Sequence, residues 1–155
     1  MSQGRDIIVQ AIANVGSRFG FKGVRGTNYY RDGAETICLL YLQKSAWGPQ
    51  FYLNAAVWFT RLGPDRRPKE HNCHIRWRVN SLMRDEESKQ FAQALDLEKP
   101  LTEDQRLSLI QNGVDAFGFG LLSRCDSEDS ALRFADESGP TVMVALAARI
   151  QEKVN

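Results

Sequence analysis

The most apolar part of the chain lies between residues 35 and 60. From Glu35 to Lys44 both alternating faces are apolar, which predicts a strand inside a sheet that is covered on both sides. After a short polar loop, the segment 51–60 alternates between an apolar face and a mixed face. We therefore expect two neighbouring strands, over 35–44 and 51–60, at the centre of a sheet.

Two shorter segments extend this sheet. The dipeptide Asp32-Gly33 is typical of a tight hairpin, and it joins a predicted strand over 27–31 to the central pair. Residues 74–79 alternate again, with apolar side chains on one face and Arg76 and Arg78 on the other. The sequence therefore predicts a four-stranded, mainly antiparallel sheet.

Helical periodicity flanks the strands. Apolar spacing predicts a helix over 4–18 before the sheet, and Thr102-Glu103-Asp104-Gln105 has the pattern of a capping box that begins a long helix. The apolar stripe of that long helix contains Leu107, Ile110, Val114, Phe117 and Leu121. Shorter helices are expected over 87–95, over 127–136 and after Pro140. This order indicates an α+β fold, with an N-terminal helix and several C-terminal helices covering the sheet.

Length and composition favour one domain over residues 1–155, because 155 residues with 43% apolar content can bury one sizeable core. No apolar run approaches the roughly 20 residues that a membrane span needs, and the first residues do not resemble a signal peptide. We expect a cytoplasmic protein without a membrane partner. Cys38, Cys73 and Cys125 are odd in number and widely spaced, which favours reduced thiols over disulfides.

The net charge of +1 hides an asymmetry along the chain. Residues 1–84 carry 13 Lys or Arg against 5 Asp or Glu, a net charge of +8, whereas residues 85–155 carry 7 against 14, a net charge of −7. In one interpretation the two halves pack together and offset each other's fields. In the other, the molecule has a basic face and an acidic face, either of which can recruit a partner of opposite charge.

Several segments of the sheet half match a known pattern. They are Gly20-Phe21-Lys22, Tyr30-Arg31, Gln43-Lys44-Ser45-Ala46-Trp47-Gly48, Phe51, Asn54 and Cys73-His74-Ile75-Arg76. In order and spacing they resemble domain-of-unknown-function family 4304. The resemblance covers most of the first 84 residues and implies a small intracellular α+β domain of bacteria. It implies no assigned reaction and therefore supplies no catalytic residues.

The residue types needed for metal binding or catalysis are sparse. His71, Cys73 and His74 lie within four residues, but a structural zinc site normally needs four ligands and the other two cysteines are distant in sequence. We expect His74 to pack or hydrogen-bond locally, and we predict no metal, cofactor or catalytic residue. No elbow motif frames a serine nucleophile. An enzyme of unrecognised type is kept as a third alternative.

The loop after the first central strand has two interpretations. Trp47, beside Lys44 and Ser45, either folds back on the sheet edge as a hydrophobic plug or projects as an aromatic anchor for a partner. We favour the plug.

Two functional hypotheses follow. The first is a non-enzymatic protein-binding module, such as an immunity-type or antitoxin-like inhibitor of a cognate toxin, in which Asp126, Glu128 and Asp129 meet a basic cleft. The second is a nucleic-acid-binding domain on the basic half. Its phosphate contacts would be Arg66, Arg67, Lys69, Arg76 and Arg78, with Tyr30, Trp47 or Trp58 stacking on bases. Neither hypothesis fixes an oligomeric state.

Overall fold

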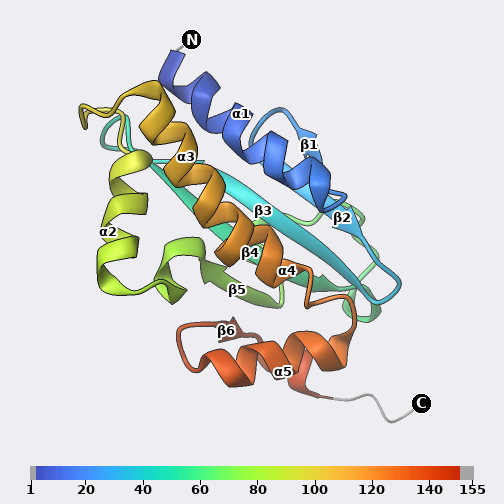
Figure 1. Ribbon diagram of the computed structural model, residues 1–155. Helices are drawn as coiled ribbons and strands as arrows, with labels where there is room; N and C mark the ends of the chain where they lie inside the picture. The colour runs from blue at the N-terminus through green and yellow to red at the C-terminus, as the bar shows by residue number, and fades with distance from the viewer. Residues whose placement is uncertain (1–2, 151–155) are drawn as a thin grey trace.

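The computed structural model describes residues 3–150, which form a six-stranded antiparallel sheet with helices packed against one face (Figure 1). The strands are β1 (Lys22–Val24), β2 (Asn28–Asp32), β3 (Thr36–Lys44), β4 (Phe51–Phe59), β5 (Ile75–Arg78) and β6 (Met143–Val144). They pair in chain order, so the sheet is a meander to which β6 returns from the far end of the chain. The α+β class predicted from the sequence is confirmed.

Helices precede and follow the sheet. They are α1 (Gln3–Arg18), α2 (Asp85–Ala94), α3 (Glu103–Gly113), α4 (Gly120–Leu122), α5 (Glu128–Ser138) and α6 (Leu146–Arg149). Short 3₁₀ turns are η1 (Thr60–Leu62), η2 (Glu70–Asn72) and η3 (Val79–Leu82), and η4 (Val114–Phe119) is a π-helical segment between α3 and α4. Between residues 3 and 150, no helix is both long enough and apolar enough to cross a membrane.

The prediction of four strands was too low by two. Strand β1 pairs with β2 through Gly23 and Tyr29, and β6 pairs with β5 through Met143 and Arg76. Both are edge strands of two or three residues, and neither contributes a buried side chain, so neither has the run of apolar residues that marks β3 and β4. The helix predicted directly after Pro140 was also wrong, because this segment leads into β6 and the one-turn helix α6.

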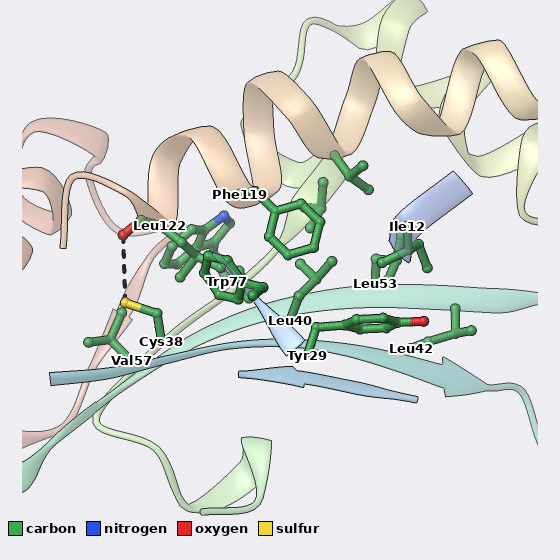
Figure 2. Close-up of a cluster of buried hydrophobic side chains, with 14 of the residues drawn as sticks. Ile12, Tyr29, Cys38, Leu40, Leu42, Leu53, Val57, Trp77, Phe119 and Leu122 are labelled. Atoms are coloured by element: carbon green, nitrogen blue, oxygen red, sulfur yellow. Dashed lines mark hydrogen bonds between the residues drawn. The ribbon is translucent and has the colours of Figure 1, made fainter. Parts of the chain in front are cut away.

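The main core lies between the inner face of the sheet and the helices (Figure 2). Alternate residues of β3 point into it, among them Leu40 and Leu42, and they face α1 and the long helix that contains η4. From that helix Phe119 is fully buried, and its ring centroid lies 4.7 Å from that of Phe21. The inner face of the sheet therefore holds the helical layer through one continuous apolar cluster.

The outer face of the sheet carries a second, smaller cluster. Its buried members are Tyr30, Ile37, Leu39, Ala56 and Cys73. The segment between β4 and β5 lies over it, where Pro68 is buried and its carbonyl accepts a 3.0 Å hydrogen bond from the Tyr30 hydroxyl. This cover explains why β3 is apolar on both faces, as the sequence predicts.

The long helix departs from regular α geometry at η4. The Gly120 N–H donates to the Asp115 carbonyl, five residues back, so one extra residue is accommodated in that turn. The stripe predicted for a regular helix holds as far as Val114 and then shifts: Phe119 and Leu122 are buried, whereas Phe117 and Leu121 are only partly covered. The helix thus presents Phe117 at its surface.

The three cysteines are free thiols and all are buried. Burial raises the pKa of the Cys38 thiol and that of the Cys73 thiol to about 12, and it raises the pKa of Cys125 as well. Cys38 donates a weak 3.6 Å hydrogen bond to the Leu122 carbonyl (Figure 2). These thiols stay protonated at neutral pH and belong to the packing of the core.

Candidate protein-binding surface

The loop between β3 and β4, residues 45–50, is held by its own polar groups. The Lys44 ammonium donates to the carbonyls of Gly48 and Ser45, at 3.2 and 3.4 Å. The Trp47 N–H donates to the Ser45 hydroxyl at 3.0 Å, and the Ser45 N–H donates to the Gln50 carbonyl at 2.8 Å. Lys44 and Ser45, both predicted as site residues, therefore fix the conformation of this loop.

Trp47 projects from the loop into solvent, with 95% of its surface exposed. The prediction that it plugs the sheet edge was wrong. The segment 95–97 already covers that edge, because the Phe51 N–H donates to the Leu95 carbonyl at 2.9 Å and the Leu97 N–H donates to the Pro49 carbonyl at 3.1 Å. Because the backbone of the loop is already ordered, binding through Trp47 costs mainly the ordering of its side chain, so Trp47 is suited to be an interface anchor.

An acidic segment lies beside the Trp47 loop. Gln50, at the end of the loop, donates its side-chain amide to the carboxylates of Asp96 and Glu98, each at 3.3 Å. Figure 1 shows the same end of the molecule, where the β3–β4 connection meets the loop between α2 and α3. An exposed aromatic side chain and two carboxylates thus lie next to each other.

The acidic cluster that the sequence singled out is tied to the basic half. Asp126 is hydrogen-bonded to Arg31, and Glu128 receives Arg61 through both Nε and Nη2, at distances of 2.9–3.1 Å. Asp129 is exposed on the first turn of α5. Two of the three predicted carboxylates therefore join the halves of the chain, which supports the interpretation that the halves offset each other here.

The larger acidic surface lies elsewhere, on α2, α3 and the segment between them. Residues 85–113 contain seven Asp or Glu and three Lys or Arg. One of the three, Arg106, is buried and donates to four backbone carbonyls. Sequence reasoning missed this surface because its carboxylates are spread over two helices. The only signal was the charge count itself.

The predicted basic residues are mostly partnered within the fold. Arg67 pairs with Asp32 at 2.9 Å, and Arg76 pairs with Glu70 at 2.9 Å. Arg78 donates to Asn54 at 3.2 Å, and its guanidinium carbon lies 4.4 Å from the Tyr52 ring centroid. Arg66 and Lys69 are exposed in the loop before β5. The side chains available for phosphate contacts are therefore fewer than the sequence suggests.

The three predicted stacking residues also differ in their surroundings. Tyr30 is buried, and its hydroxyl is used by Pro68. Trp58 is partly buried, with its ring centroid 4.4 Å from that of His74. Of the three, Trp47 alone presents a ring that is open on both faces.

His74 is used locally. Its Nδ1 accepts a 2.9 Å hydrogen bond from the Phe59 N–H, and its ring lies against Trp58. Within residues 3–150, no group of three or more His, Cys, Asp or Glu side chains is placed to hold a metal ion. The local role expected for His74 is therefore the one observed.

His74 should make stability depend on pH. Burial, together with nearby Arg61, lowers the pKa of His74 below its ordinary value of about 6.5. The unfolded chain then binds the proton more readily, so this contribution is present above about pH 6.5 and is lost as the pH falls further. We expect urea unfolding to show a smaller loss of stability between pH 7.5 and 5 in His74→Asn, whose Oδ1 can still accept from Phe59. The exposed His71 gives the control, because His71→Asn should leave that loss unchanged. An unchanged loss in His74→Asn would contradict the assignment.

A family model described as a domain of unknown function, DUF4304, matches residues 12–124. The chain belongs to the DUF4304 family. The match includes β1 to β5, α2 and the long helix from α3 to α4, so it spans both the Trp47 loop and the acidic helices of this DUF4304 member. No curated protein and no solved structure matches the chain.

Proposed function

We propose that this DUF4304 member is a non-enzymatic protein-binding module whose anchor is Trp47. The observation that carries the proposal is a 95% exposed indole on a loop fixed by Lys44 and Ser45. Packing within the described part of the fold therefore does not account for a tryptophan at this position. Tryptophan is enriched among the residues that dominate binding energy at protein interfaces.

The charge around the anchor indicates what the partner offers. Asp96 and Glu98 lie beside the loop, and the α2–α3 region is acidic as a whole. A matching partner presents an apolar pocket for the indole, surrounded by Lys or Arg, because complementary charge speeds encounter and fixes register. The basic cleft of a nucleic-acid-degrading toxin has this chemistry, so an immunity-type or antitoxin-like inhibitor in bacteria is the form of the proposal that we favour.

The test is binding to the product of the adjoining reading frame in the chain's own genome, measured by co-purification and calorimetry. We expect Trp47→Ala to weaken binding by about 30-fold or more, equivalent to about 2 kcal/mol, and to change the free energy of unfolding by less than about 0.5 kcal/mol. The matched control is Leu146→Ala, because Leu146 is also a largely exposed apolar residue but lies on α6. Equal effects of the two substitutions would contradict the proposal.

The alternative hypothesis, a nucleic-acid partner, can be tested with the wild-type chain and its variants. A pool of single- and double-stranded oligonucleotides at low salt should show no retention if the chain binds protein. Retention that is lost both in Trp47→Ala and in a variant with Arg66, Arg67, Arg76 and Arg78 changed to alanine would favour the nucleic-acid hypothesis instead.

A further inference from the structure

A furrow runs between α2 and α3 on the acidic surface. It consists of two adjoining hollows, of about 360 and 570 Å³, which share Gln90 and Leu109 in their linings. Along the long helix it extends from Asp104 to Phe117, a length of about 20 Å at 1.5 Å per residue. We call it the α2–α3 furrow.

The floor of the furrow is apolar and is only partly buried by the core. Leu101, Leu109 and Phe117 line it, and each is only partly buried against the core. Phe117 is there because of η4: the extra residue in that turn sends Phe119 into the core and leaves Phe117 at the surface. Single π-helical turns within α-helices are frequent at functional sites. The π-helical turn and the furrow therefore lie at the same place in the fold.

The two charged side chains that line the furrow are both acidic. Asp104 lines it on α3, and Glu87 lines it on α2, where its carboxylate also lies 3.7 Å from the Arg84 guanidinium. No Lys or Arg of residues 3–150 lines either hollow, and the other polar lining groups are amides and a serine hydroxyl. A second copy of the chain would bring the same carboxylates against these, so self-association through the furrow is disfavoured.

We infer that the α2–α3 furrow receives a basic amphipathic helix of the partner protein, an inference that rests on the proposed protein-binding function. An apolar stripe of three to four turns matches the length and floor of the furrow, and Lys or Arg beside the stripe meet Glu87 and Asp104. Trp47 and the furrow would then be two parts of one acidic, aromatic surface.

The probe is a fluorescein-labelled 14-residue Leu/Lys peptide that forms an amphipathic helix, titrated with the folded chain by fluorescence anisotropy. We expect it to bind, and a peptide of the same composition in permuted order, without the stripe, to bind at least about 10-fold more weakly. A Leu/Glu peptide should not bind. Absence of Leu/Lys binding, or equal binding of the permuted peptide, would overturn the inference.

Two substitutions locate the site. Asp104→Asn should weaken peptide binding about 2- to 5-fold, as expected for one exposed charge pair. Asp129→Asn is its matched control, because both residues are exposed and stand two places after the capping residue of their helices, Thr102 and Ser127. Equal weakening by the two would show that the peptide senses only net charge, and would overturn the inference.

A steric variant strengthens the test. Ser108 is exposed and lines the furrow, so Ser108→Arg should reduce peptide binding by more than about 10-fold by filling the furrow and repelling the peptide. Ala13→Arg, on the exposed side of α1, should leave binding unchanged. Circular dichroism of each variant checks that the fold is retained. Unchanged binding in a folded Ser108→Arg protein would overturn the inference.

The furrow and the anchor can fail separately. Trp47→Ala should leave peptide binding unchanged, because Trp47 does not line the furrow. If Trp47→Ala weakens partner binding but the Leu/Lys peptide does not bind, the proposed function stands and the inference about the furrow is overturned. If the peptide binds in the furrow but Trp47→Ala does not weaken partner binding, the inference about the furrow stands and the proposed anchor role of Trp47 is contradicted.

Discussion

Replacing Arg106 by methionine should lower the free energy of unfolding by about 3–4 kcal/mol, measured by urea denaturation. Arg106 is 6% exposed, and the Asp96 carboxylate lies near enough to offset part of the lowering of its pKa by burial. The guanidinium donates to the carbonyls of Ala94, Asp96 and Lys99, at 2.7, 3.1 and 2.8 Å. The substitution leaves these acceptors without their donor and removes a cation from the negative end of the α2 dipole.

The geometry of the guanidinium provides a graded check. Arg106→Lys keeps the charge but cannot reach carbonyls on both sides with one ammonium group, so we expect a loss of about 2 kcal/mol. Arg133→Met is the matched control, because Arg133 is an exposed arginine on α5, and its effect should stay within about 0.5 kcal/mol. If Arg106→Met were as mild as the control, the carbonyl contacts would not hold the α2–α3 connection.

Truncating Phe119 should cost about 4 kcal/mol, whereas truncating Phe117 should cost about 1 kcal/mol. Phe119 is fully buried against Phe21, with its ring also close to Phe19 and Tyr29. Phe117 is partly exposed in the α2–α3 furrow. Thermal and urea unfolding of Phe119→Ala and Phe117→Ala measure the two values side by side.

This pair of variants tests η4 directly. In a regular helix the apolar spacing from Leu107 and Ile110 places Phe117 in the core and Phe119 away from it. The order of the two losses would then be reversed. A larger loss in Phe117→Ala than in Phe119→Ala would therefore contradict the π-helical turn and, with it, the floor of the furrow.

The fold was predictable where many residues repeat one pattern. The strands β3 and β4 are each nine residues long and mostly apolar, and the capping box at Thr102 is formed as predicted, with the Thr102 hydroxyl accepting from the Gln105 N–H. Strands β1 and β6 are too short to repeat any pattern. The η4 turn was not predicted, because one inserted residue shifts the apolar stripe of the helix to other positions without changing the amino-acid composition.

The candidate site was harder to predict because it depends on contacts between distant parts of the chain. Lys44, Ser45 and Trp47 were named as candidates from the sequence, but the exposure of Trp47 depends on where Leu95 and Leu97 pack. Likewise, only the fold brings Arg31 to Asp126 and Arg61 to Glu128. Charge counts located an acidic half, and tertiary pairing decides which of its carboxylates stay open to a partner.

The burial of Cys38, Cys73 and Cys125 makes the chain a convenient carrier for site-directed probes. Alkylating reagents attack the thiolate, and these thiols are both inaccessible and held protonated in the folded state. A single cysteine introduced on the surface can therefore carry a fluorophore or spin label without removal of the natural three. The rates at which the three natural thiols are labelled would in turn measure how often the native protein opens around each of them.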